Sequence, residues 1–168
     1  MLALDRVPPL GKKIDDDFEA PVVLLQHGIE DSSIQWVINS PELAIAFVLS
    51  RAGYDVWMGN NRGNHNSKKH ISLDPSSSDF WEFDFEEMGL YDVPAMTDFI
   101  LKTTEGKNKI GKLAAYIGHS EGTTQFFIGA SLKPDYYKEK VNLFVSLAPV
   151  VRLDHSPNKL MVHASVIY

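Results

Sequence analysis

The segment LAAYIGHSEGTTQFF, residues 113–127, constrains the fold most, because it puts a sharp turn between an apolar strand-like run and a helical pattern. Gly-x-Ser-x-Gly in that setting is typical of a nucleophile elbow, although five residues alone are a weak signal. Gly118 and Gly122 suit the points where strand and helix backbones pass too close for a side chain. The segment predicts Ser120 as a nucleophile at a helix start, with His119 in a packing or orienting role.

Short apolar runs alternate with helical patterns along the chain, and this alternation predicts an α/β fold with a mostly parallel sheet and flanking helices. About five strands are expected, over 1–7 (an edge), 21–27, 54–58, 112–119 and 141–150. Expected helices cover 42–52, 120–131 and 134–140, together with a short and then a longer helix over 80–104, the longer one entered around 92–94. The polar stretch 59–79 is expected to be a long loop, of a kind that is usually functional or mobile.

Composition excludes several classes of function. The 16 basic and 22 acidic residues give a formal charge of −6, which leaves no electrostatic footprint for nucleic acid. The absence of cysteine excludes a thiol nucleophile and a disulfide. The longest apolar runs, such as LAIAFVL, are too short to span a membrane, and the first residues lack the order of a signal peptide.

A second segment, LLQHGI at 24–29, follows the first buried strand and is expected to lie beside the elbow. Backbone N–H groups there could receive a developing oxyanion, and we expect the amides of Ile29 and Glu121 to do so. Gly28 and His27 belong to the same loop. His27 is interpreted as a hydrogen-bonded structural histidine, with loop ordering or substrate contact as the alternative.

Several segments together resemble the acid lipase family of α/β-hydrolases, which includes gastric and lysosomal acid lipases and steryl ester hydrolases. The resemblance covers about 2–152 and rests on LLQHGI, YDVWMGNNRGN, FWEFDFEEMGLYDVPAMTDFIL, YIGHSEGTTQFF and VSLAPV. It implies a partial α/β-hydrolase fold that hydrolyses triacylglycerols or cholesteryl esters through an acyl-enzyme at Ser120 and a Ser/Asp/His triad. It implies a lysosomal or secreted location. Transient contact with a lipid surface is also expected, and neither a cofactor nor a metal is.

Glu121 stands where the resembling family usually has glutamine. A carboxylate beside a developing oxyanion should repel it, unless the group points away or is protonated. We interpret Glu121 as a solvated first-turn acid, and expect Glu121→Gln to leave activity unchanged or raise it.

The acid and histidine of the triad are the missing elements. They follow the serine in α/β-hydrolases, and only 48 residues follow Ser120 here. The candidates are Asp135, Asp154, His155 and His163. None is expected to be held beside Ser120, so the triad acid and histidine are predicted to be absent from this chain.

The chain is therefore interpreted as one truncated α/β-hydrolase domain over 1–168, with 153–168 starting a lid or forming an irregular tail. Weak or no activity is expected of it alone. The alternatives are a non-catalytic hydrolase-like fragment or binding protein, and another acyl hydrolase such as a thioesterase or peptidase. The strand within 142–148 would become an apolar edge that favours self-association.

Other polar and aromatic residues receive simpler interpretations. A metal site at His65, His70 and Asp74 is disfavoured, because the spacing fits no ligand pattern. Arg62 is expected to pin its loop through carbonyls or a carboxylate. Core packing is favoured over lipid contact for four aromatic residues, Phe80, Trp81, Phe83 and Phe85.

Overall fold

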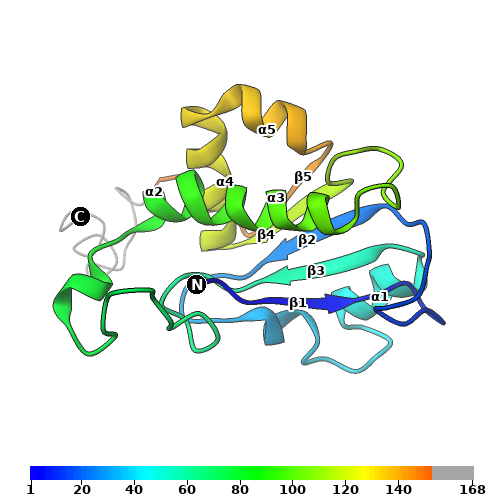
Figure 1. Cartoon of the computed structure of the whole chain (residues 1–168), viewed down its shortest axis with the longest axis horizontal. Coiled ribbons are helices and arrows are strands. Elements are labelled where there is room, and N and C mark those ends of the chain that lie inside the picture. Colours follow the sequence, from blue (N-terminus) through cyan, green and yellow to red (C-terminus); the bar gives the residue numbers. More distant parts are fainter. Residues whose placement is uncertain (153–168) are drawn as a thin grey trace.

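The computed structural model describes residues 1–152 and contains a five-stranded sheet in the order β1-β3-β2-β4-β5 (Figure 1). The strands are β1 (Leu4–Val7), β2 (Val22–Gln26), β3 (Asp55–Gly59), β4 (Ala115–His119) and β5 (Phe144–Leu147). β1 is antiparallel to β3, and the other pairings are parallel. The predicted α/β class, strand number and edge position of the first strand are confirmed.

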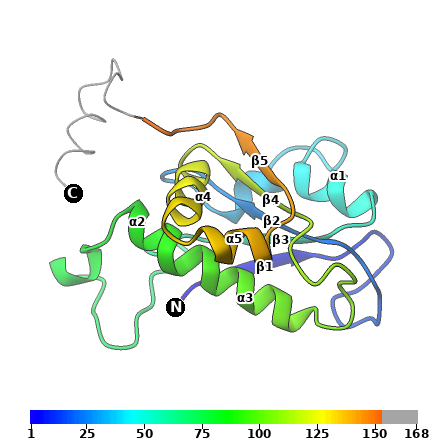
Figure 2. The same cartoon turned by 90° about the horizontal axis from the view of Figure 1, so that it is seen from above.

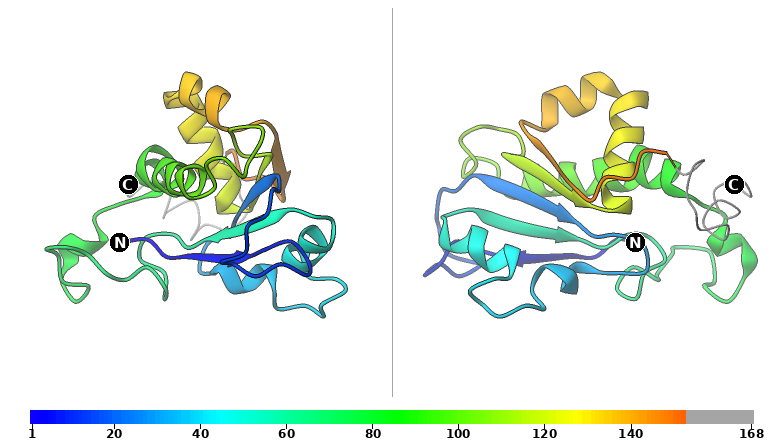
Figure 3. Two further views of the ribbon diagram at one scale, coloured as in Figure 1. Left: turned by 45° about the vertical axis from the view of Figure 1, so that its right-hand side comes forward. Right: turned by 180° about the vertical axis from the view of Figure 1, so that it is seen from behind.

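Helices cover both faces of the sheet (Figures 2 and 3). One face carries α1 (Ile45–Arg51) and the 3-10 turn η1 (Ser33–Trp36). The other carries α3 (Val93–Thr103), α4 (Glu121–Leu132) and α5 (Pro134–Lys140). The shorter segments η2 (Ser78–Trp81), α2 (Phe85–Glu87) and the π-helical η3 (Met88–Asp92) precede α3. Within residues 1–152, no helix combines the length and apolar character that crossing a membrane requires.

The central strand β2 sends its side chains alternately into two apolar clusters. Val22 and Leu24 pack with α3 residues such as Met96, while Val23 and Leu25 pack on the side of α1. Every residue of β2 and β3 is buried, which agrees with the continuous apolar run that predicted a strand covered on both faces.

One of two helix boundaries differs from the sequence expectations. The helix expected at 42–52 begins only at Ile45, because the carbonyl of Ser40 accepts the amides of Leu43 and Ala44 in a preceding turn. The start of the longer helix at 92–94 is confirmed. α3 begins at Val93, where Pro94 takes a first-turn position that needs no intrahelical N–H bond, although the π-helical η3 directly before it was not predicted.

The long loop after β3 contains no helix or strand before Ser78, as predicted, and buried polar contacts hold it in place. The Oδ1 of Asn60 accepts bonds from the amide of Ser33 (3.1 Å) and the Nδ2 of Asn64 (3.0 Å). Arg62 donates to both carboxylate oxygens of Asp92, at 2.8 and 2.6 Å. Arg62 is thus pinned by a carboxylate, as the sequence predicted, and its loop is fixed against η3.

Candidate active site

Ser120 occupies a strained turn between the end of β4 and the start of α4. Its backbone angles are φ 50° and ψ −117°, a conformation that non-glycine residues rarely adopt. Backbone contacts hold the strain, since the N–H of Ser120 donates to the carbonyl of Leu147 at 3.0 Å. The carbonyl of Ser120 accepts the amide and the hydroxyl of Thr123 at 2.9 and 2.6 Å. The backbone N–H and carbonyl of Ser120 are therefore both hydrogen-bonded, and its side chain faces a cavity.

Three glycines allow the backbones around Ser120 to approach one another. A Cβ placed on Gly118 would lie 2.7 Å from the carbonyl atoms of Gly122, and one on Gly122 would lie 2.4 Å from the carbonyl oxygen of Gln26. A Cβ on Gly28 would lie 3.0 Å from the Cβ of Ser120. At Gly118 and Gly122, β4, α4 and the end of β2 therefore meet at distances that only glycine permits, and the contact at Gly28 is tight.

Two backbone amides at this meeting point have no acceptor. Within residues 1–152, neither the N–H of Ile29 nor that of Glu121 donates a hydrogen bond. Both residues line the same cavity as Ser120. Unpaired N–H groups beside a serine hydroxyl form the arrangement that can stabilise an oxyanion.

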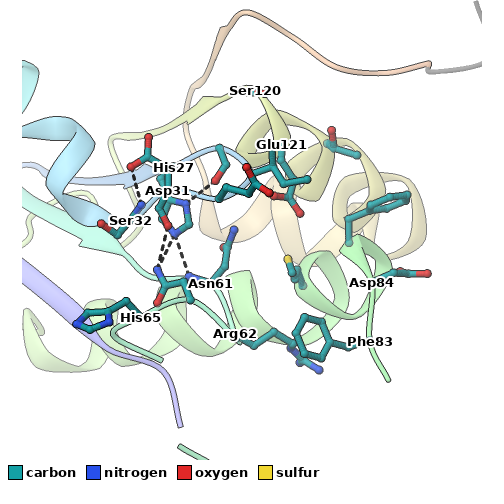
Figure 4. Close-up of a pocket in the computed structure, with 18 of the residues that line it drawn as sticks. His27, Asp31, Ser32, Asn61, Arg62, His65, Phe83, Asp84, Ser120 and Glu121 are labelled. Atoms are coloured by element: carbon teal, nitrogen blue, oxygen red, sulfur yellow. Dashed lines mark hydrogen bonds between the residues drawn. The ribbon is translucent and has the colours of Figure 1, made fainter. Parts of the chain in front are cut away.

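The cavity next to Ser120 has a volume of about 800 Å³ (Figure 4). Its apolar wall consists of Ile29, Ile34, Trp81, Phe83, Phe85, Met88 and Val150. Among the four aromatic residues assigned to packing, Phe80 is buried as expected. The other three line the cavity instead, because the loop containing Arg62 and Gly63 packs against their segment.

His27 is buried in the wall of this cavity, and both ring nitrogens have partners. Its Nδ1 lies 2.6 Å from the carbonyl oxygen of Gly28, and its Nε2 lies 3.1 Å from the amide nitrogen of Asn61. Burial lowers the pKa of His27. His119 is partly buried, and its Nδ1 lies beside Gly28 without a hydrogen-bond partner among residues 1–152, which fits a packing role.

Glu121 differs from its sequence interpretation as a solvated acid. The residue is partly buried in the cavity wall, and burial raises the pKa of its carboxyl group to about 7. The reason is tertiary, because the cavity walls also come from four other segments, which approach Glu121 only in the folded chain. At acid pH the side chain beside Ser120 is therefore neutral.

Among the residues considered as bases, only Asp135 lies within residues 1–152, and it is not at the cavity next to Ser120. Asp135 is exposed in the first turn of α5, and Asp154, His155 and His163 lie outside the described residues. His65 is exposed at the cavity, while His70 accepts the amides of Ser72 and Leu73. Within residues 1–152, no group of three or more His, Asp or Glu residues is placed to hold a metal ion.

Two threonines that the sequence reasoning missed fix the far wall of the cavity. The hydroxyl of Thr124 donates to the carbonyl of Val150 at 2.7 Å, and the amide of Val150 donates to the Thr123 hydroxyl at 2.9 Å. Both backbone groups of Val150 are thus held by α4. The sequence feature that could have identified them is the Thr-Thr pair directly after the elbow, because both hydroxyls lie on the first helical turn.

The comparisons with known proteins agree with this geometry. A family model described as the alpha/beta hydrolase fold matches residues 21–168, so the chain belongs to the α/β hydrolase family. Among solved structures, a potato epoxide hydrolase matches with a TM-score of 0.58 at 14% identity, covering 99% of this chain and 42% of that one. A lidless serine hydrolase from Xanthomonas campestris matches with a TM-score of 0.54 at 18% identity, covering 93% and 60%.

Curated relatives confirm the resemblance to acid lipases. Gastric triacylglycerol lipase of Mus musculus is 46% identical over 154 residues, which are 90% of this chain and 38% of the relative. Lysosomal acid lipase/cholesteryl ester hydrolase of Macaca fascicularis is 44% identical, over 92% of this chain and 37% of the relative. The chain therefore spans less than two fifths of the length of these relatives.

The close contacts of the glycines predict that adding a side chain would destabilise the fold. Gly122→Ala should destabilise the fold by about 1–3 kcal/mol, because the added methyl group would press against the carbonyl of Gln26, although alanine favours helices. Urea unfolding of the variant measures this. Ser131→Ala, at an exposed position of the same helix, should stay within about 0.5 kcal/mol of the parent. Equal stability of the two variants would contradict the close approach.

Glu121 predicts a pH-dependent stability. Its pKa is raised from 4.5 to about 7, so the folded chain retains a proton that the unfolded chain loses between these values. Stability must then fall as the pH rises through this range. Glu121→Gln should stabilise the chain at pH 8, by at most about 3 kcal/mol, and much less at pH 4.5.

Denaturant unfolding at the two pH values measures the difference. Glu105→Gln, at an exposed position after α3, is the control, and its effect should be the same at both. If Glu121→Gln changed the free energy of unfolding equally at pH 8 and pH 4.5, the carboxyl group would be solvated.

Proposed function

We propose that this chain carries the nucleophile and oxyanion donors of a serine ester hydrolase that acts on neutral lipid esters, triacylglycerol or cholesteryl ester. The observation that carries the proposal is the strained Ser120 at the mouth of a largely apolar cavity, with two unpaired amides beside it. The names of the lipase relatives support the substrate class.

The chemistry follows from the elbow. The Ser120 Oγ attacks the ester carbonyl carbon, and the carbonyl oxygen becomes an oxyanion facing the amides of Ile29 and Glu121. The C–O bond then breaks, the alcohol leaves with a proton, and an acyl-enzyme remains until water releases the carboxylic acid. The neutral form of Glu121 favours this oxyanion at acid pH, because an ionised carboxylate would repel it.

The cavity wall supports an apolar acyl group over a peptide. Seven of its side chains are apolar or aromatic. The serine itself lacks a base, because no histidine of residues 1–152 hydrogen-bonds the Ser120 hydroxyl to activate it. The exposed Trp81 at the cavity also supports transient contact with a lipid surface. We therefore propose weak hydrolysis by the chain alone, supplied by the oxyanion donors and substrate binding.

Ester turnover tests this function. We expect slow release of p-nitrophenol from a p-nitrophenyl ester with a medium-length acyl chain. Ser120→Ala should reduce the rate to background, and the exposed Ser131→Ala should not. Equal turnover by the parent chain and Ser120→Ala would overturn the nucleophile assignment.

We also propose self-association through the edge 142–148. β5 pairs with β4 on one side only within residues 1–152, and its other side presents free backbone groups. Light scattering at high concentration should detect dimers or larger species.

Leu143→Lys on this edge should restore the monomer. Leu132→Lys on α4 is the matched control, because the two leucines are 53% and 54% exposed. A clean monomer of the unaltered chain would contradict the proposal.

A further inference from the structure

His27 lies directly after β2, and only 1% of its surface is exposed. Its two ring nitrogens face different segments (Figure 4). Nδ1 faces the carbonyl oxygen of the next residue, Gly28, at 2.6 Å. Nε2 faces the loop after β3, with the amide nitrogen of Asn61 and the Nδ2 of Asn64 both at 3.1 Å.

These partners determine the tautomer of His27. A carbonyl oxygen can only accept, so Nδ1 must carry the hydrogen. The amide N–H of Asn61 can only donate, so Nε2 must present its lone pair. The ring is therefore neutral, in agreement with a pKa lowered by burial. A base or substrate-contact role would require breaking one of these bonds.

The Nδ1–H bond fixes the orientation of one peptide group. The C=O of Gly28 and the N–H of Ile29 belong to the same planar trans unit and point in opposite directions. A carbonyl held toward the imidazole thus turns the Ile29 amide away from it. The same loop touches the nucleophile, because a Cβ on Gly28 would lie 3.0 Å from the Cβ of Ser120.

We propose that His27 is a positioning residue, which holds the Gly28–Ile29 peptide so that the Ile29 amide faces the oxyanion formed at Ser120. The inference rests on the proposed function. His27 touches no reacting atom and acts through the peptide. Asn61 and Asn64 hold the Nε2 side of the ring in place.

A pair of substitutions separates the two bonds of His27. In His27→Asn the amide nitrogen takes nearly the place of Nδ1, so the bond to the Gly28 carbonyl can be kept while the Asn61 bond is lost. In His27→Gln the side-chain oxygen takes nearly the place of Nε2, so the Asn61 bond can be kept while the Gly28 bond is lost. The two variants therefore have similar polarity but differ in whether the bond to the Gly28 carbonyl is kept.

The readout is the rate at which an alkyl fluorophosphonate labels Ser120. In this reaction the Oγ–P bond forms, fluoride leaves, the hydroxyl proton passes to solvent, and a phosphoryl oxygen occupies the oxyanion position. His27→Gln should slow labelling by about 10²-fold, the cost of losing one oxyanion donor. His27→Asn should slow it less than tenfold. Equal rates in the two variants, or a slower His27→Asn, would overturn the proposal.

Nuclear magnetic resonance keeps the test independent of reactivity and of variant folding. In the unaltered chain, the imidazole ¹⁵N spectrum should show a protonated Nδ1 and an unprotonated Nε2. The reverse pattern would overturn the inference. The Ile29 amide signal should move in His27→Gln and stay nearly in place in His27→Asn. An unaltered chain that does not label would count against the proposed function, while these spectra still decide the role of His27.

Discussion

The approach of three backbones at Gly118, Gly122 and Gly28 is the constraint on which the rest of the site depends. Each glycine lies where a Cβ would meet atoms of a neighbouring segment at 3.0 Å or less. Because β4, α4 and the loop after β2 can pass this close, Ser120 can take its strained turn while its backbone groups remain hydrogen-bonded. The packing of the sheet thus compensates the strain at the nucleophile.

Features that depend on local sequence could be predicted, and features that depend on distant segments could not. The strands, the elbow and the loop from 59 follow from apolar runs and glycine positions, and the structure contains them. The start of α1 was missed, because Ser40 accepts two amides in a competing turn. The π-helical segment η3 before α3 was missed as well. It depends on α4, since a Cβ on Gly89 would lie 2.6 Å from the carbonyl oxygen of Gln125.

The electrostatic properties of the site also depend on distant segments and could not be predicted from the local sequence. An acid in a first helical turn is normally solvated, and nothing local to Glu121 indicated otherwise. Its raised pKa comes from walls that the folded chain assembles around it. The contacts of His27 with Asn61 and Asn64 also join residues more than thirty positions apart, beyond the reach of sequence spacing. Its position after the first buried strand identified the loop, but the hydrogen bonds define what its histidine does.

The role of Ser120 is tested most directly by a crystal structure of the chain after reaction with an alkyl fluorophosphonate. We expect phosphorus bonded to the Oγ of Ser120, with one phosphoryl oxygen within hydrogen-bond distance of the Ile29 and Glu121 amides. We also expect the alkyl group to lie against the apolar wall of the cavity. An unmodified Ser120, or a phosphoryl oxygen turned to solvent while both amides stay unpaired, would contradict the claim that this elbow is built as a nucleophile.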